Sequence, residues 1–346
     1  MKAFVTGAPG WLGTALVAHL AGDSLGDEAR PQAVESLRCL VEPGADRREL
    51  GRWKTVQVVE GDLRDSDALA RFFEDGRGGT VFHAAGIVHP TRGVGQFYDV
   101  NVEGTKALLA AAERAGIRRF VHVSSNSPIG VGRRPDAVFD EASPYDPYMH
   151  YGRSKMLAEL AVEAAGETGR LETVIVRPPW FYGPYQPPRQ TLFFTMIRTG
   201  RVPLVGDGEN RRSMAYVDNI AQGLWLAATV ESARGRIYWI ADRRPYTMNE
   251  VVTTIENVME EHFGVTPARK RVRLPSVASE IAWVADKALQ GLGLYAQKVH
   301  VLSEMNKTIA CSIAKAEREL GYRPEIDLAE GMRRSMQWLK ERGISW

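Results

Sequence analysis

The segment Tyr151-Gly152-Arg153-Ser154-Lys155 contains two side chains that together can move a proton. It begins a run of helical composition, so Tyr151 and Lys155 fall on one helix face, about 5–6 Å apart at Cβ. A phenol has an ordinary pKa of about 10, and a fixed ammonium beside it favours the phenolate. The pair is therefore a candidate general acid/base for a hydroxyl proton. Because Tyr-x-x-x-Lys is common by chance, a helix start with a surface Lys is the alternative.

A second chemical signal lies near the N-terminus. A short apolar stretch over 2–6 leads into Gly7, Gly10 and Gly13, and a helical run over 14–20 follows. Strand, glycine turn and helix is the order of a dinucleotide site, because glycines let the backbone approach a pyrophosphate and the helix start offers free N–H groups. The spacing is G-x-x-G-x-x-G, not G-x-G-x-x-G, and a structural glycine turn would look similar.

Strands and helices must position these groups, and they alternate along the first half of the chain. Further strands are expected over 37–41, 55–59, 80–82, 120–123 and 173–177. The alternation predicts an α/β fold with a parallel, doubly wound sheet, in which ligands bind beyond the carboxyl ends of the strands. The small or polar residues at these ends are Gly7, Glu42, Asp62, Ala84, Ala85, Gly86, Ser124 and Ser125. Their coincidence predicts a cofactor site.

Glu42, at the end of the second strand, bears on the choice of cofactor. An acid there accepts hydrogen bonds from ribose hydroxyls and repels a 2′-phosphate, which predicts NAD over NADP. The nearby Arg38, Arg47 and Arg48 could accept a phosphate instead. Asp62, after the third strand, could hold the adenine amino group or cap the next helix.

Composition excludes several classes of function. The 346 residues carry a net charge of +2, which gives no whole-chain argument for nucleic acid or a membrane surface. Cys39 and Cys311 form no motif and suit a reducing cytoplasm. No signal-peptide layout is present, and no apolar run approaches the ~20 residues of a membrane span. The seven histidines lack metal-ligand spacing, and neither Ser124 nor Ser125 lies in a G-x-S-x-G elbow. We expect a cytoplasmic protein that acts on a small molecule.

From Leu171 the regular alternation of strands and helices gives way to irregular stretches rich in Gly, Pro and Arg. This predicts a dinucleotide-binding domain over 1–176 and a smaller, irregular C-terminal substrate-binding lobe over 177–346, with some segments returning to the first domain. One cluster in the lobe is either an apolar substrate wall or interface core: Trp180, Phe181, Leu192, Phe193, Phe194 and Met196.

Together these features resemble the extended short-chain dehydrogenase/reductase superfamily, in its NAD-dependent epimerase/dehydratase group, and imply a Rossmann fold. The resemblance covers nearly the whole chain. It rests on Thr6-Gly7-x-x-Gly10-x-x-Gly13, Gly61-Asp62-Leu63-x-Asp65, His83-Ala84-Ala85-Gly86, Asn101-Val102-x-Gly104-Thr105, Val123-Ser124-Ser125, Tyr151-x-x-x-Lys155, Arg177-Pro178 with Tyr182-Gly183-Pro184, and Tyr216-Val217-Asp218-Asn219.

The resemblance implies roles for individual residues. Tyr151 exchanges a proton with a substrate hydroxyl or carbonyl, and Lys155 binds the nicotinamide ribose and lowers the Tyr pKa. Ser125 hydrogen-bonds the same substrate oxygen, with Ser124 as the competing assignment. The implied cofactor contacts are Gly7, Gly10, Trp11, Leu12, Gly13, Glu42, Asp62, Leu63, Ala84, Ala85, Gly86, Asn101, Tyr151, Lys155 and Pro178. The implied substrate contacts are Ser124, Ser125, Asn126, Tyr182 and Arg212. A homodimer through the helices starting near Asn101 and Tyr151 is also implied.

The family catalyses several reactions, and the positions at which this sequence differs from the family motifs indicate which of them to expect. Sugar dehydratases have carboxylates just after the catalytic Ser or Thr, whereas Asn126-Ser127 follow here, so dehydration and decarboxylation are not expected. Epimerases usually close that loop with an aromatic-Gly pair, and this chain has Ile129-Gly130. Epimerases also carry an Arg for the substrate diphosphate, and Arg212 stands in that place.

Three segments, 217–219, 237–242 and 319–324, look closer to the 3β-hydroxysteroid dehydrogenase-like branch. We therefore expect an NAD(P)-dependent oxidoreductase that interconverts a secondary alcohol and a ketone. The alternative is a nucleotide-sugar 4-epimerase with tightly bound NAD. A third possibility, a non-catalytic dinucleotide sensor, is disfavoured by the intact Ser125, Tyr151 and Lys155.

Overall fold

The computed structural model describes residues 1–23 and 34–346. Its centre is a seven-stranded sheet in the order β11-β6-β5-β4-β1-β2-β3, and every neighbouring pair is parallel. The strands are β1 (Lys2–Thr6), β2 (Ser36–Val41), β3 (Val56–Glu60), β4 (Thr80–His83), β5 (Arg119–Val123), β6 (Glu172–Arg177) and β11 (Arg236–Trp239). The expected parallel, doubly wound α/β sheet is confirmed.

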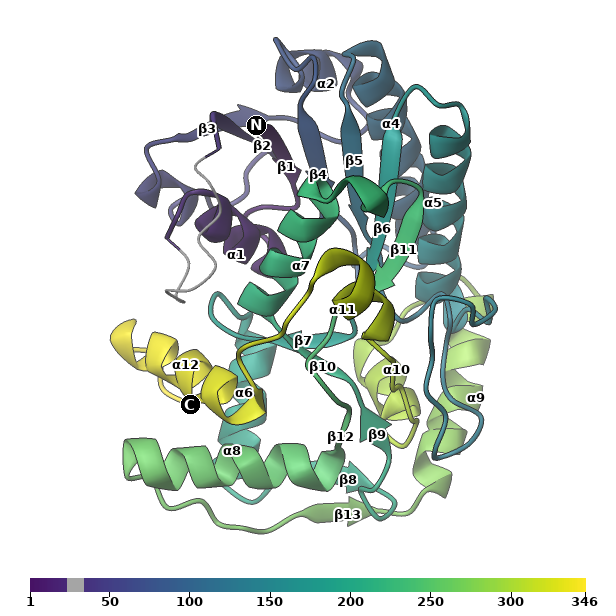
Figure 1. Ribbon diagram of the computed structural model, residues 1–346. Coiled ribbons are helices and arrows are strands. Elements are labelled where there is room, and N and C mark those ends of the chain that lie inside the picture. Colours follow the sequence, from purple (N-terminus) through teal and green to yellow (C-terminus); the bar gives the residue numbers. More distant parts are fainter. Residues whose placement is uncertain (24–33) are drawn as a thin grey trace.

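Helices cover both faces of this sheet (Figure 1). One face packs against α1 (Trp11–Leu20) and α7 (Val217–Thr229), and the other against α2 (Ser66–Phe72), α4 (Thr105–Arg114) and α5 (Met149–Glu167). Because the central strands are covered twice, every residue of β4 and β5 is buried. The polar side chains of these two strands, Thr80, His83, Arg119 and His122, are therefore buried together with the apolar ones.

The helix expected over residues 101–115 is built differently. It starts as α3 (Gly95–Tyr98), passes through a π-helical turn over Asp99–Gly104 and continues as α4. π-helical turns often mark functional positions, and this one contains the buried Asn101.

The remaining elements form a smaller region below the carboxyl ends of the strands (Figure 1). They are β7 (Trp180–Tyr182), α6 (Pro188–Arg198), β8 (Pro203–Val205), β9 (Arg211–Arg212), β10 (Met214–Tyr216), β12 (Tyr246–Thr247), α8 (Met248–Phe263), β13 (Val272–Leu274), α9 (Val277–Gly291), α10 (Gln297–Glu304) and α12 (Leu328–Glu341). Within this part of the sequence, β11 and α7 return to the main sheet, and α11 (Ala314–Leu320) packs against both of them.

The aromatic cluster of this region is core. Phe194 is fully buried, and Trp180 and Phe193 pack edge to face 5.8 Å apart against the same core. Leu192, the cluster member that is 56 % exposed, points away from that packing. Phe181, by contrast, lines the cavity beyond the strand ends. The structure therefore supports interface core for Phe194, Trp180 and Phe193, and a place in the cavity wall for Phe181.

Candidate active site

A cavity of about 530 Å³ lies beyond the carboxyl ends of the central strands. It collects residues from the glycine turn, from the ends of β2 to β5 and from α5. The predicted site residues that line it are Gly7, Gly10, Trp11, Leu12, Gly13, Glu42, Asp62, Leu63, Ala84, Ala85, Gly86, Ser124, Ser125, Tyr151, Lys155 and Pro178. The structure thus brings the two chemical signals of the sequence, the glycine turn and the Tyr-Lys pair, into one site.

The glycine turn has the shape of a dinucleotide cradle. Gly7 has φ +93°, and a Cβ there would lie 2.5 Å from the backbone of Ala84 and Ala85. Any side chain would therefore collide with the end of β4. Gly10 caps α1 without a side-chain hydrogen bond, and the first turn of α1 has no acidic residue. The helix start keeps its free N–H groups and positive dipole end for an anion.

The acidic residues beyond β2 and β3 have separate roles. Asp62 accepts 2.8 Å hydrogen bonds from Arg64 Nε and Nη2, which hold the pKa of Asp62 below its ordinary value. The capping role belongs instead to Asp65, whose carboxylate accepts from the N–H groups of Asp67 and Ala68 at 2.9 and 3.2 Å. Asp62 therefore stays in the cavity wall.

The three arginines that could have received a 2′-phosphate are engaged elsewhere. Arg38 donates to Gln57 and to the carbonyls at the end of α2, Arg47 pairs with Glu60 at 3.1 Å, and Arg48 pairs with Asp46. Glu42 lines the cavity, whereas none of the three arginines does.

Helix α5 carries Tyr151 and Lys155, the candidate catalytic pair, into the cavity. Burial raises the pKa of Tyr151 to about 12, and the Glu304 carboxylate adds to the rise while a hydrogen bond with Ser125 opposes it. Burial lowers the pKa of Lys155 to about 8. The expectation that Lys155 lowers the Tyr151 pKa is not met in this structure, because the Lys155 ammonium donates to the Val123 carbonyl at 2.8 Å.

A buried polar cluster lies beneath Lys155. His83 Nδ1 is 2.7 Å from Thr6 Oγ1 and its Nε2 is 2.8 Å from Thr105 Oγ1, while His122 Nε2 is 3.4 Å from Lys155 Nζ. Burial lowers the pKa of His83 to about 3 and that of His122 well below its ordinary value. Both imidazoles are therefore neutral at pH 7, and Lys155 is the cation of this cluster.

The geometry favours Ser125 over Ser124 as the partner of Tyr151. Ser125 is the serine whose hydroxyl lowers the pKa of Tyr151, and its Oγ lies 3.3 Å from Ser127 Oγ. Ser124 Oγ is buried without a protein partner, although it lines the same cavity. The residues after Ser125 are Asn126, half-buried and outside the cavity wall, and Ser127, so no carboxylate follows the catalytic serine.

Two predicted contacts are corrected by the structure. Tyr182 is fully buried, and its hydroxyl donates to Asp242 at 2.8 Å, so it supports the core and cannot touch a substrate. Asn101 does not line the cavity. Its side chain accepts from Ile87 N–H at 2.7 Å and donates to Ser154 Oγ at 3.0 Å, which ties the segment after β4 to α5. Asn101 is therefore a positioning residue.

Arg212 is neither a surface residue at a turn nor part of the cavity wall. It lies in β9, donates through Nη2 to the Glu304 carbonyl, and has a buried Nε with no hydrogen-bond partner. Burial lowers its pKa, with Glu304 and Tyr148 opposing the shift. The Glu304 carboxylate thus acts on both Arg212 and Tyr151, raising the pKa of each.

Sequence reasoning missed several residues around the site. Arg92 and Arg189 line the cavity, and His89 Nδ1 is 2.7 Å from the hydroxyl of Tyr295. His89 and Arg92 lie in the segment between β4 and α3, Arg189 lies in the first turn of α6, and Tyr295 lies between α9 and α10. No spacing rule joins these three parts of the chain, so no local signal could have found the residues.

A buried ion pair supports the catalytic helix from behind. Glu159, one turn after Lys155, accepts from Arg177 Nε at 3.0 Å and Nη2 at 2.6 Å. Their side chains are 0 % and 2 % exposed, and Tyr145 donates to the same carboxylate at 2.8 Å. The pair fixes α5 to the end of β6.

Comparison with known proteins places these residues in context. The family model "NAD dependent epimerase/dehydratase family" matches residues 3–241. The uncharacterized protein y4nL of Sinorhizobium fredii is 48% identical over 345 residues, which covers 99% of this chain and 96% of that protein. A dTDP-glucose 4,6-dehydratase of an Actinoplanes species is 30% identical over the full length of both chains. Among solved structures, DesIV, a dTDP-glucose 4,6-dehydratase from Streptomyces venezuelae with NAD and TYD bound, is 28% identical, with a TM-score of 0.75 and coverage of 99% and 98%.

Proposed function

This chain belongs to the NAD-dependent epimerase/dehydratase family, and from that premise we propose that it is a nucleotide-sugar epimerase. In this proposal it oxidises a secondary hydroxyl of the sugar to a ketone and then reduces the ketone from the other face. NAD fits the site, because the Gly7 cradle and the uncapped start of α1 match a pyrophosphate and Glu42 matches an unphosphorylated ribose. When bound, NAD supplies the hydride acceptor.

The protein's own residues supply the proton chemistry. Tyr151 would take the hydroxyl proton as general base and return it as general acid, while Ser125 holds the same oxygen. The raised pKa of Tyr151 makes the phenolate unfavourable in the free protein. Lys155, the buried cation one turn along α5, is the group that would stabilise the phenolate once its ammonium turned from the Val123 carbonyl.

One observation carries the choice of substrate: two arginines, Arg92 and Arg189, line the cavity. An anionic group is the partner that a guanidinium recognises best. A substrate diphosphate would supply that partner, and an uncharged sterol would not. The relatives whose names specify a nucleotide-sugar substrate support the same choice.

Elimination of water is not part of the proposal. The dehydratases need carboxylates after the catalytic Ser or Thr, and this chain has Asn126 and Ser127 there. The second candidate is the expected sterol-type dehydrogenase. It is favoured by the C-terminal segment over 319–324 and disfavoured by the burial of the aromatic cluster around Phe194 in the core.

The test is incubation of the purified protein with UDP- and dTDP-linked sugars, followed by chromatographic separation of the products. The proposal predicts interconversion of two epimers without net NADH formation. Steady NADH formation with a hydroxysteroid would support the second candidate. A 4-keto-6-deoxy product would contradict the argument from Asn126 and Ser127.

We also keep three expectations as proposals. The chain divides into a cofactor domain over 1–176 and a substrate lobe over 177–346, it forms a homodimer through α4 and α5, and it is cytoplasmic. The dimer is supported by the exposed Leu160, 43 % accessible on α5. Sedimentation of the wild type against Leu160→Glu tests it.

A further inference from the structure

Helix α9 carries an exposed apolar stripe that the proposed function does not use. The spacing of its aliphatic side chains places them on one helix face. Single exposed aliphatics are ordinary on a protein surface, whereas a contiguous set marks an interaction surface. The members of this α9 stripe, with their exposed fractions, are Val277 (56 %), Ile281 (64 %) and Val284 (60 %) in the helix and Leu292 (77 %), the residue that caps its C-terminus.

The opposite face of α9 is firmly attached, so the stripe is not a sign of a loose helix. Asp286 accepts from His300 Nδ1 at 2.7 Å and from Gln290 Nε2 at 2.9 Å, and all three side chains are buried. Ser279 Oγ donates to the carbonyls of Leu302 and Ser303 at 2.9 Å. These bonds hold α9 against α10 and leave the stripe facing outward.

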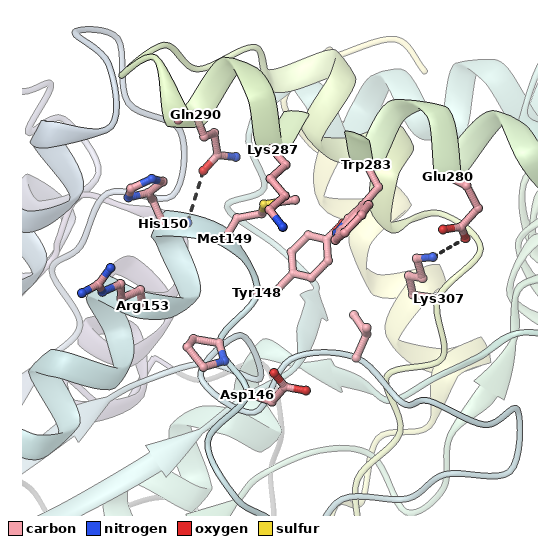
Figure 2. Close-up of a pocket in the computed structure, with 13 residues that line it drawn as sticks. Asp146, Tyr148, Met149, His150, Arg153, Glu280, Trp283, Lys287, Gln290 and Lys307 are labelled. Carbon is pink, nitrogen blue, oxygen red and sulfur yellow. Dashed lines mark hydrogen bonds and ion pairs between the residues drawn. The ribbon is translucent and has the colours of Figure 1, made fainter. Parts of the chain in front are cut away.

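A basic groove runs along one edge of the stripe. It is a cavity of about 670 Å³ between α9 and the start of α5, and Figure 2 shows Arg153 and Lys287 among its lining side chains. Its two carboxylates are already paired, Asp146 with Arg133 and Glu280 with Lys307. Within residues 1–23 and 34–346, no carboxylate lies within ion-pair distance of Arg153 or Lys287.

We propose that the α9 stripe is a membrane-binding face that lies in the headgroup layer of an anionic bilayer, with Arg153 and Lys287 taking a lipid phosphate. An apolar face flanked by cations is the arrangement of helices that lie in the plane of the interface. Between residues 270 and 307 the chain has six Lys or Arg and three Asp or Glu, which suits an anionic surface. Among residues 1–23 and 34–346, no helix has the length and apolar character that crossing a membrane requires.

A second copy of the chain fits the stripe less well. A 15-residue helix is about 22 Å long and about 10 Å wide, so two facing stripes would bury only about 450 Å² in total. A stable interface usually buries about 1,200–2,000 Å². A bilayer needs no shape complementarity and can cover the stripe together with the groove beside it.

The membrane face is connected to one wall of the catalytic cavity. Immediately after the stripe, the Gly293 carbonyl accepts from Val94 N–H at 3.1 Å, and Tyr295 pairs with His89. The segment that includes His89 and Val94 also contains Arg92, which lines the cavity. A bound bilayer would therefore contact a helix that is hydrogen-bonded to this segment of the cavity wall.

Cosedimentation with vesicles tests the proposal. The full chain is mixed with neutral phosphatidylcholine vesicles and with vesicles that contain phosphatidylglycerol. We expect binding to the anionic vesicles. The double variant Ile281→Gln, Leu292→Gln should weaken this binding at least about tenfold, since each substitution removes aliphatic area that the side chain would bury in the bilayer. Lys287→Gln should weaken binding about fivefold, and only for the anionic vesicles. Ile344→Gln, a matched exposed aliphatic on the C-terminal segment at 41 %, should bind like the wild type.

Thermal unfolding and NAD affinity of each variant show whether it is folded, because none of these residues lines the cofactor cavity. The proposal is overturned if the wild type does not bind anionic vesicles, or if the double variant binds as well as Ile344→Gln. A sedimentation coefficient that falls from dimer to monomer in the double variant would instead make the stripe a self-interface.

Discussion

Replacing Glu159 with Gln tests how the catalytic helix is held. The change keeps the shape of the side chain but removes the only carboxylate bonded to Arg177 among the described residues, at 2.6 and 3.0 Å. Breaking one partner of a buried ion pair typically costs about 3–5 kcal/mol, because the other charge stays buried without compensation. Against a total stability of about 5–15 kcal/mol, that is a large fraction.

Urea unfolding followed by tryptophan fluorescence measures this loss. Glu167→Gln is the matched control at the exposed end of the same helix, and it should change the free energy of unfolding by less than about 0.5 kcal/mol. The double variant Glu159→Leu, Arg177→Met should recover part of the stability, since apolar replacement of both partners is often neutral. A loss below about 1 kcal/mol for Glu159→Gln would refute the reasoning.

Three other predictions concern the cofactor site. Glu42→Gln should shift preference toward NADP, as titration of both cofactors would show, and tighter NADP than NAD binding by the wild type contradicts the assignment. Gly7→Ala should abolish NAD binding in calorimetry, because its Cβ would lie 2.5 Å from the Ala84 backbone. The folded pKa of Lys155 is about 8 against 10.5 in the unfolded chain, so its burial penalty is full below pH 8 and disappears as pH rises to 10.5. The free energy of unfolding of Lys155→Met should exceed that of the wild type below pH 8, and the difference should shrink between pH 8 and 10.5. A difference that stays constant over this interval in urea unfolding would contradict the burial of the Lys155 ammonium.

The sheet and the cofactor cavity could be predicted because their signals are local. Each strand is a short segment rich in β-branched and other apolar residues, and the rule that ligands bind at strand ends converts separate positions such as Gly7, Asp62 and Ser125 into one site. The cavity contains all three. Tyr151 and Lys155 could be predicted for the same reason, since residues four positions apart on a helix lie on one face.

The substrate side could not be predicted because it is built from contacts between distant segments. Arg212 meets Glu304 across 92 residues, and the hydroxyl of Tyr182 meets Asp242 across 60. No periodicity relates such positions. The conformation of a flexible side chain cannot be predicted from spacing either. Spacing placed Lys155 beside the Tyr151 phenol, but its ammonium donates to the Val123 carbonyl.

The most direct test of the account is the turnover of Tyr151→Phe, measured together with its affinity for NAD. The variant keeps the ring and removes the hydroxyl that Ser125 hydrogen-bonds. General acid/base groups typically contribute about 10²–10⁴-fold, so turnover should fall by that factor. The NAD dissociation constant should stay nearly unchanged, because the phenol serves the substrate oxygen. A variant that keeps more than about a tenth of the wild-type rate would contradict general acid/base catalysis by Tyr151.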